Sequence, residues 1–269
     1  MSAAAAQLLP QVADIARRAG REILAVYRSA DFAVTTKSDA SPVTAADLRA
    51  HRVIVAALAE LTPQVPVLSE EAAHTPFAQR AQWQRYWLVD PLDGTREFLA
   101  RNGQFTVNIA LIEGHAPVLG VVHAPQRELT YEGLAGAGAG AWRAAAGAAA
   151  QPIHVSAKAH RPVRVAGSRS HRGNSLAPFL ERLGEHELLA VGSALKFCLV
   201  AEGAADVYPR LGPTSEWDTA AAHAVLVGAG GSVNCLDGTA LRYNTRDELL
   251  NPFFVAYGPK DRDWLALLR

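Results

Sequence analysis

The sequence predicts a protein of the α/β class, and two patterns carry this prediction. From residue 161 onward, apolar stretches typical of strands alternate with stretches typical of helices. Before that point, amphipathic helices precede a run of consecutive strands. Alternation of this kind favours layers of helices packed on sheets. The 269 residues suffice for one large domain or two modest ones.

Two helices and a series of hairpin strands are predicted for the first half. Residues 5–28 repeat apolar side chains at helical spacing. A second helix is expected at 45–61, because Thr44 is a plausible N-cap and Asp47 follows three residues later. The strands are expected within 85–90, 104–114, 116–125 and 128–142.

The second half carries the alternation itself. Strands are predicted at 161–168, 187–193, 206–210 and 253–258, and helices at 175–184, 194–205, 216–231 and 260–269. An Ala/Gly-rich stretch at 135–150 indicates a hairpin and a linker. We therefore expect an N-terminal α+β domain at 1–150 and a C-terminal α/β domain at 151–269.

Charge and composition exclude several classes of function. Basic and acidic residues number 26 each, so the chain lacks the net positive charge of nucleic-acid-binding proteins. Two cysteines, Cys198 and Cys235, are too few for a disulfide framework and fit a reducing cytosol. Neither a signal peptide nor an uncharged apolar run of transmembrane length is recognisable, so no transmembrane segment is expected.

The stretch WLVDPLDGTREF ends an apolar strand in two carboxylates. Asp90 and Asp93 lie three residues apart, and the turn between them directs the Leu92 carbonyl oxygen to the same region. Oxygen donors of this kind suit Mg²⁺ or Mn²⁺. The following amides, of Gly94 and Thr95, can bind a phosphate oxygen at a helix start. Spacing alone leaves a metal site and a purely structural turn equally open.

Four further carboxylates are candidates for the same site. Glu70 and Glu71 follow an apolar stretch, Asp218 begins a helix, and Asp47 lies in the first turn of another. Taken singly, each is equally explained as a solvated carboxylate or one that stabilises a helix N-terminus. If they converge with the strand-end aspartates, they form a site for two or three divalent ions.

The motifs SEE, WLVDPLDGTREF and EWDTAA together resemble the lithium-sensitive inositol monophosphatase superfamily of Mg²⁺-dependent phosphatases. Further stretches, including KSDASPVTAAD, LGVVHAP and LKFCLVAEGAADVYPR, are similar to its 3′(2′),5′-bisphosphate nucleotidases, and matches run from about residue 5 to residue 256. The resemblance implies a layered αβαβα sugar-phosphatase fold. It also implies hydrolysis of 3′-phosphoadenosine 5′-phosphate to AMP and phosphate, in support of sulfate assimilation, with the sulfated nucleotide as a second substrate.

The same resemblance implies roles for the acidic residues. Glu70 and Thr95 are expected to orient and activate the attacking water, Asp47 to hydrogen-bond Thr95, and Glu71 to support them. The implied cofactor is Mg²⁺, as two or three ions, with Mn²⁺ as a substitute. The implied metal ligands are Glu70, Asp90, the Leu92 carbonyl, Asp93 and Asp218.

A nucleotide bisphosphate also needs positive charge from the protein. Lys196 follows Ser193 by one helical turn, and a helix starting at Gly192 or Ser193 would present amides to the same anion. Arg210 ends a strand and suits a bidentate phosphate contact. The resemblance places Ser168, Arg169 and His171 near the adenosine, and Tyr208 is a candidate to flank the base. The expected substrate contacts are Gly94, Thr95, Ser168, His171, Ser193, Lys196, Arg210 and Asp218.

Two other functions remain open from the sequence. One is an inositol-monophosphatase-type or other sugar-phosphate phosphatase, which would share the acidic motifs but not LKFCLVAEGAADVYPR in this form. The other is a regulatory binding protein that kept the fold without the chemistry. The expected partner is a small-molecule nucleotide, without nucleic acid, and the chain is expected to be a monomer or homodimer. The expected location is cytoplasmic, with attachment to the cytoplasmic face of the inner membrane as the alternative.

Overall fold

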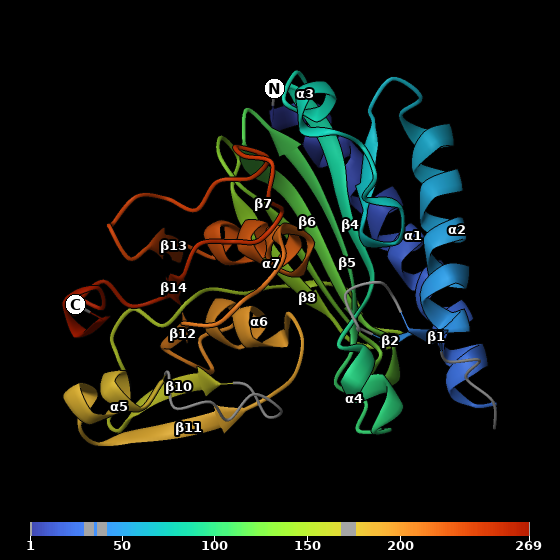
Figure 1. Ribbon diagram of the computed structural model, residues 1–269. Helices are drawn as coiled ribbons and strands as arrows, with labels where there is room; N and C mark the ends of the chain where they lie inside the picture. Colours follow the sequence, from blue (N-terminus) through green and yellow to red (C-terminus); the bar gives the residue numbers. More distant parts are fainter. Residues whose placement is uncertain (1, 30–34, 37–41, 168–175, 269) are drawn as a thin grey trace.

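The molecule consists of alternating layers of helices and sheets (Figure 1). The computed structural model describes residues 2–29, 35–36, 42–167 and 176–268. From one side to the other, the layers are two long helices, a seven-stranded sheet, a pair of central helices, a five-stranded sheet and a short outer helix. These helices are α1 (Ser2–Tyr27) and α2 (Ala45–Leu61), then α6 (Leu195–Ala201) and α7 (Glu216–Gly228), then α5 (Ala177–Leu183). The αβαβα arrangement implied by the resemblance is confirmed.

The seven-stranded sheet has the order β3-β4-β5-β6-β7-β8-β9, antiparallel except for the parallel pair β3–β4. The strands are β3 (Val67–Ser69), β4 (Arg85–Asp93), β5 (Thr106–Glu113), β6 (Ala116–Ala124), β7 (Leu129–Leu134), β8 (Gly140–Ala144) and β9 (Gln151–Pro152). Along β5, Val107 and Ile109 pack in the cluster with α1 and α2, whereas Ala110 and Ile112 pack in the cluster with α7. Both faces are therefore covered, which explains why residues 109–112 of this strand are apolar without a break.

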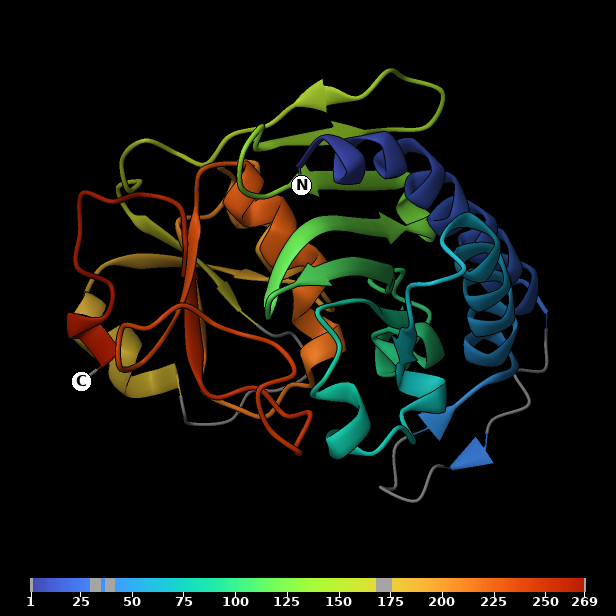
Figure 2. The ribbon, with the colours of Figure 1, turned by 90° about the horizontal axis from the view of Figure 1, so that it is seen from above.

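The two outer helices cover the far face of this sheet (Figure 2). Both were predicted, and α2 begins where its capping residues indicate. The Thr44 side chain accepts a hydrogen bond from the Ala46 amide at 3.1 Å, and the Thr44 amide donates to Asp47 Oδ2 at 2.7 Å. This capping box fixes the first turn of α2 and buries the Asp47 side chain.

The central helix α7 lies unusually close to the opposite face of the sheet. It contacts β4, β5, β6 and β7, although it comes from the other half of the chain. Two glycines make this approach possible. A methyl group on Gly120 would overlap the Ala221 carbonyl, and one on Gly133 would overlap the Val225 backbone. Glycine is therefore required here by backbone proximity and not by a turn.

Gly120→Ala is expected to destabilise the protein by about 3 kcal/mol, because the added methyl must push α7 away from β6. Urea unfolding would measure this loss. Gly212→Ala is the matched control, since its nearest neighbour would be the Arg210 Cζ at 3.9 Å. Equal stability of the two variants would show that α7 moves without cost.

The five-stranded sheet has the order β11-β10-β12-β14-β13. Its strands are β10 (Val163–Gly167), β11 (His186–Ala190), β12 (Val207–Arg210), β13 (Ser232–Cys235) and β14 (Phe254–Tyr257). Strand β10 runs parallel to both of its neighbours, and β14 pairs antiparallel with β12 and β13. On the outer face, Val165 and Val207 pack with Phe179 of α5 and with Trp264.

The remaining elements are short and include several that were not predicted. They are β1 (Thr35–Thr36), β2 (Pro42–Val43), η1 (Glu70–Ala72), α3 (Phe77–Arg80), α4 (Thr95–Leu99), η2 (Pro125–Arg127) and η4 (Ala266–Leu268). The unpredicted strands β3 and β13 are only 3 and 4 residues long, too short for a periodic signal.

The predicted helix at 260–269 is wrong, because within the described residues 260–268 only the short 3-10 helix η4 forms. The Asp263 carboxylate accepts hydrogen bonds from the Leu265 and Ala266 amides, both at 3.1 Å. The Trp264 indole donates to the Pro259 carbonyl at 2.8 Å and is buried against the outer sheet. These local bonds replace those that a helix would make.

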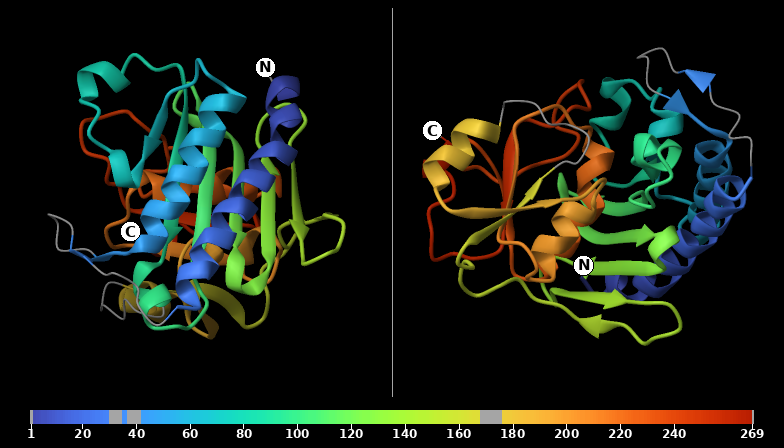
Figure 3. Two further views of the ribbon diagram at one scale, coloured as in Figure 1. Left: turned by 90° about the vertical axis from the view of Figure 1, so that its right-hand side faces the viewer. Right: turned by 90° about the horizontal axis from the view of Figure 1, so that it is seen from below.

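The two sheets come from successive parts of the chain (Figure 3). The strands of the first lie between residues 67 and 152, and those of the second between 163 and 257. The division at residue 150 into two domains stays a prediction, since α7 of the second half packs on the first sheet.

Two expectations from composition can be compared with the described part of the chain. Cys198 is buried, Cys235 is half-buried, and both are free thiols. Among the described residues, no helix combines the length and the apolar character needed to cross a bilayer.

Candidate active site

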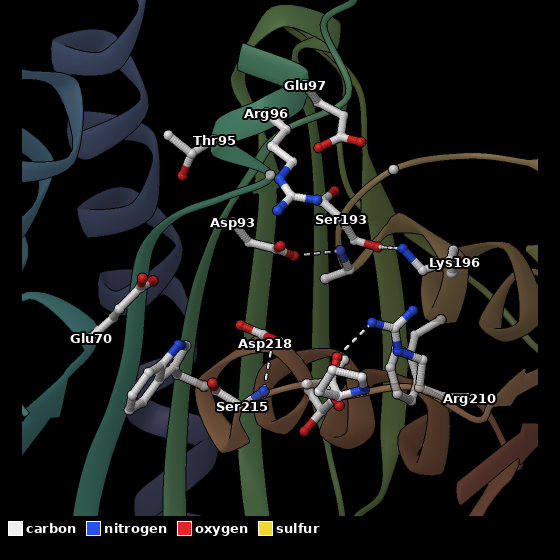
Figure 4. Close-up of a pocket in the computed structure, with 18 of the residues that line it drawn as sticks. Glu70, Asp93, Thr95, Arg96, Glu97, Ser193, Lys196, Arg210, Ser215 and Asp218 are labelled. Atoms are coloured by element: carbon white, nitrogen blue, oxygen red, sulfur yellow. Dashed lines mark hydrogen bonds between the residues drawn. The ribbon is translucent and has the colours of Figure 1, made fainter. Parts of the chain in front are cut away.

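A cavity of about 380 Å³ lies where β4 ends, beneath α4 and above the N-terminus of α7 (Figure 4). Its lining comes from both halves of the chain. Glu70, Asp93, Gly94 and Thr95 come from the first half, and Ser193, Lys196, Arg210, Ser215 and Asp218 from the second. The carboxylates of Glu70, Asp93 and Asp218 lie toward one side of the cavity and Lys196 and Arg210 toward the other, while Arg96 and Glu97 extend from α4 above them (Figure 4).

A bulge at the end of β4 gives Asp90 and Asp93 their positions. Asp90 pairs with Asn108 and Asp93 with Thr106, so β4 has one more residue than β5 between these pairs. The Leu92 amide donates to Asp90 Oδ1 at 3.0 Å. The predicted turn at residues 91–95 therefore starts later than expected, since pairing continues to Asp93 and the chain turns at Gly94 with φ of 90°.

A capping box positions Asp218 in the first turn of α7, as another positions Asp47 in α2. The Ser215 amide donates to Asp218 Oδ2 at 2.8 Å, and the Ser215 side chain accepts from the Asp218 amide. In both helices the aspartate occupies the third position. Each helix N-terminus therefore fixes one carboxylate and supplies a favourable dipole.

Asp90, Asp93 and Asp218 form a compact acidic cluster. One ligand oxygen from each lies within 4.8 Å of the others. Burial raises the pKa of Asp93 to about 6. Burial, with the charges of Asp93 and Glu70, raises the pKa of Asp218 to about 8, and burial with the Glu70 charge raises that of Asp90 well above its usual value. Buried carboxylates that repel one another fit a bound divalent cation, whose charge would hold them ionised.

Glu70 and Asp47 lie beside this cluster. Glu70 begins η1 and lines the cavity. Burial raises the pKa of Asp47 to about 6, and the charges of Glu71 and Glu70 add to that shift. Glu71 is thus close enough to influence Asp47, although it does not line the cavity.

The implied hydrogen bond between Asp47 and Thr95 is absent among the described residues. Asp47 Oδ2 instead accepts from the Thr44 amide and hydroxyl, both at 2.7 Å. The Thr95 hydroxyl donates to the Leu92 carbonyl at 3.4 Å. The capping box of α2 thus uses Asp47 Oδ2, and the Leu92 carbonyl is the acceptor for the Thr95 hydroxyl.

The buried Lys196 supplies positive charge at the cavity. Its Nζ donates to the Ser193 carbonyl at 2.6 Å and lies 5.5 Å from the centre of the Tyr208 ring. Burial lowers the pKa of Lys196 to about 8, and the Asp93 charge opposes this shift. Tyr208 lines the cavity with one face and otherwise packs in the core against Phe197.

Arg210 is a further cation in the cavity lining, beside Lys196 and Arg96. It ends β12, as predicted, and its Nη2 donates to the Pro213 carbonyl at 2.6 Å. This bond fixes the guanidinium beside the cavity and leaves donors for an anion, since a guanidinium has five. Lys196 and Arg210 together provide two cationic groups apart from the acidic cluster.

The predicted helix start at Gly192 or Ser193 is wrong, because α6 begins at Leu195. Ser193 takes a left-handed conformation with φ of 52°. The Ala194 amide donates to Asp93 Oδ2 at 2.6 Å. An acceptor from the first half of the chain therefore takes one amide that was expected to bind substrate phosphate.

The predicted contacts Ser168, Arg169 and His171 lie outside the described residues. Conversely, the sequence reasoning missed Thr106 and Asn108, whose side chains lie 3.5 Å and 3.3 Å from Asp93 Oδ2. Two polar residues at alternate positions of an apolar strand were the available signal. Gln104 was also missed, and its side chain accepts a hydrogen bond from the Gly192 amide at 2.8 Å.

Comparisons with known proteins agree with this geometry. The sequence profile described as "Inositol monophosphatase family" matches residues 5–263. The chain is 51% identical to "3'(2'),5'-bisphosphate nucleotidase CysQ" of Salmonella typhimurium, over 92% of this chain and 98% of that protein. The corresponding Escherichia coli (strain K12) protein is 50% identical over the same shares.

Solved structures show the same similarity. The crystal structure of CysQ from Bacteroides thetaiotaomicron has a TM-score of 0.79 and 39% identity, and the match covers 94% of this chain and 97% of that one. An inositol monophosphatase from Anabaena has a TM-score of 0.76 at 24% identity, over 97% of this chain and 95% of that one. The second match shows the shared fold alone.

Proposed function

This chain belongs to the inositol monophosphatase family, and on that basis we propose that it is a metal-dependent 3′(2′),5′-bisphosphate nucleotidase. The proposed reaction converts 3′-phosphoadenosine 5′-phosphate and water to AMP and phosphate. The sulfated nucleotide is proposed as a second substrate. Relatives named as this nucleotidase, 51% and 50% identical to the chain, support the proposal.

The observation that carries the proposal is the division of charge within one cavity. The acidic cluster suits metal ions and a scissile phosphate, while Lys196 and Arg210 can hold a second anionic group. A substrate with two separated phosphates satisfies both ends. A simple sugar monophosphate would leave the two cations without an anion.

In the proposed reaction, the water oxygen bonds to the 3′-phosphorus, the bond from this phosphorus to O3′ breaks, and O3′ receives a proton. We assign Glu70 to accept the proton of the water and Thr95 to orient it. The amides of Gly94 and Thr95 are the proposed donors to the scissile phosphate. Bound divalent cations would supply positive charge for the phosphate and lower the pKa of the attacking water.

The proposed cofactor is Mg²⁺, bound as two or three ions, with Mn²⁺ able to replace it. Carboxylate and carbonyl oxygens, without His or Cys ligands, are the donors these ions prefer. The proposed ligands are Glu70, Asp90, the Leu92 carbonyl, Asp93 and Asp218. Calcium and lithium are expected to inhibit. A cytoplasmic location, a role in sulfate assimilation and a monomeric or homodimeric state stay predictions.

Phosphate release tests the proposal, with 3′-phosphoadenosine 5′-phosphate, its sulfated form, inositol 1-phosphate and fructose 1,6-bisphosphate as substrates. Each is assayed with Mg²⁺ and with a chelator. Release that depends on Mg²⁺ and favours the adenosine nucleotides supports the proposal. Preference for inositol 1-phosphate would favour the sugar-phosphatase alternative. Absence of release from all four, with Mg²⁺ present, would favour a binding protein.

Arg210→Gln is expected to reduce kcat/KM for the nucleotide bisphosphate by about 10- to 100-fold, because a charge-assisted contact is lost. Release from 3′-AMP, which lacks the 5′-phosphate, should change by less than about threefold. Parallel kinetics on the two substrates measure the difference. Arg242→Gln, at an exposed position, is the matched control. Equal losses on both substrates would assign Arg210 to the scissile phosphate instead.

A further inference from the structure

Arg80 is a buried cation that joins the two halves of the chain. Only 1% of its surface is exposed. Its Nη1 donates to Asn244 Oδ1 at 2.6 Å and to the Arg246 carbonyl at 3.0 Å. Its Nη2 donates to the Asp247 carbonyl, and the guanidinium lies 4.9 Å from the centre of the Phe77 ring. These partners bind several N–H donors of one planar guanidinium group, an arrangement that the ammonium group of lysine cannot reproduce.

The contacts of Arg80 lead to the N-terminus of α7. Asn244 returns a hydrogen bond from its side chain to the Arg80 carbonyl at 2.6 Å. The Asn244 amide donates to both oxygens of the buried Glu216, each at 2.9 Å. Glu216 is the first residue of α7, two positions before Asp218. The Arg80 charge is also close enough to lower the pKa of Glu216, against the larger effect of burial.

Arg80 is also the last residue of the segment that begins with Glu70. This segment runs through η1 and α3, from residue 70 to residue 80. Its start follows β3, where Ser69 Oγ lies 2.9 Å from His51 Nδ1. Its end is α3, whose last residue is Arg80. Glu70 and Glu71 therefore lie on a short connection held at both ends.

We propose that Arg80 is a positioning residue that sets where Glu70 lies relative to Asp218. The inference rests on the proposed function of this site, because Glu70 and Asp218 matter as a pair only if they bind metal together. Glu70 and Asp218 come from different halves of the chain and line the same cavity. Hydrogen bonds join Arg80 through Asn244 to Glu216 in the first turn of α7, and the chain joins Arg80 to Glu70 through α3 and η1.

The connection gives a reason for the burial of a charged residue that does not line the cavity. A buried guanidinium is costly unless several acceptors surround it, and removing one partner leaves the others uncompensated. The connection should therefore have one well-defined geometry. Ligand positions must be accurate for small octahedral ions such as Mg²⁺. Supporting residues of this kind typically change metal affinity by about 10- to 100-fold when lost.

Two variants separate positioning from general stability. Arg80→Lys keeps the charge but loses the planar guanidinium group. Asn244→Gly removes only the side-chain link to Arg80, since glycine tolerates the φ of 53° at this position and retains the amide that binds Glu216. Asp206→Asn is the control. It alters another buried network, in which Asp206 accepts from His160 Nδ1 at 2.7 Å and from the Arg164 amide at 2.8 Å.

Calorimetric titration with Mg²⁺ alone measures the dissociation constant of each variant without any substrate. We expect it to rise about tenfold in Arg80→Lys and Asn244→Gly, and by less than twofold in Asp206→Asn. Thermal unfolding shows whether all three lose comparable stability. Unchanged Mg²⁺ affinity in both test variants would overturn the proposal, as would an equal loss in the control. Because this readout needs no turnover, it stands even if the wild-type protein fails to hydrolyse the nucleotide.

Discussion

Asp93→Asn is expected to reduce phosphate release from 3′-phosphoadenosine 5′-phosphate by at least about 10³-fold. Asp93 belongs to the three-carboxylate cluster and lines the cavity. Asparagine has nearly the same shape and can still accept the Ala194 amide, which now donates to Asp93 at 2.6 Å. What is lost is the negative charge needed for a divalent cation. The substitution should therefore lower kcat much more than it lowers the stability of the folded protein.

Stability provides the second readout for this variant. Three neighbouring carboxylates repel one another when no cation is bound, so removal of one charge should leave the metal-free protein at least as stable as the wild type. Mg²⁺ should stabilise the variant much less than the wild type. Asp237→Asn, which removes an exposed charge remote from the cavity, should match the wild type in both assays. Activity within tenfold of the wild type in Asp93→Asn would exclude the proposed metal site.

Local capping chemistry was the part of the site most readable from sequence. Thr44 and Asp47, three residues apart, form a capping box. This spacing predicted the start of α2 correctly. The same spacing between Ser215 and Asp218 begins α7. These bonds join residues close in sequence, so the local residue pattern is sufficient to predict them.

Contacts distant in sequence account for what could not be predicted. The helix expected at 194–205 does begin close by, at Leu195, but the amides of an earlier start at Gly192 or Ser193 are not available as expected, since Asp93 takes the Ala194 amide from 101 positions away. Arg80 stood in no recognisable motif, because its partner Asn244 is 164 positions away. Neither acceptor could be assigned before the fold brought the two halves together.

The α/β class was predicted because strand and helix patterns alternate along the second half of the chain, and the layered αβαβα arrangement was implied by the family resemblance. Helices cover both faces of β5. The close approach of α7 through Gly120 and Gly133 was not predicted. A glycine in a strand indicates a bulge or a close contact, and sequence alone does not say with which element.

Removal of Mg²⁺ is expected to make the stability of the protein strongly dependent on pH. Burial raises the pKa of Asp93 to about 6, and burial with the charges of Asp93 and Glu70 raises that of Asp218 to about 8, above values near 3.9 in the unfolded chain. The folded state therefore binds protons that the unfolded state releases. The metal-free protein should lose stability as pH rises from about 4 through these folded pKa values. A pKa that is higher by one in the folded state than in the unfolded state corresponds to about 1.4 kcal/mol, so the combined loss reaches several kcal/mol.

Thermal unfolding with Mg²⁺ and with a chelator, at pH 5 and at pH 8, measures this effect. We expect Mg²⁺ to raise Tm by about 10 °C or more at pH 8 and by much less at pH 5, where protons compete for the carboxylates. Burial lowers the pKa of His123 to about 4 and that of His223 to about 3, so acid also destabilises the protein through these histidines. That contribution is the same with and without Mg²⁺ and cancels in the difference. An Mg²⁺ effect that is equal at both pH values would mean that the cation binds away from Asp93 and Asp218.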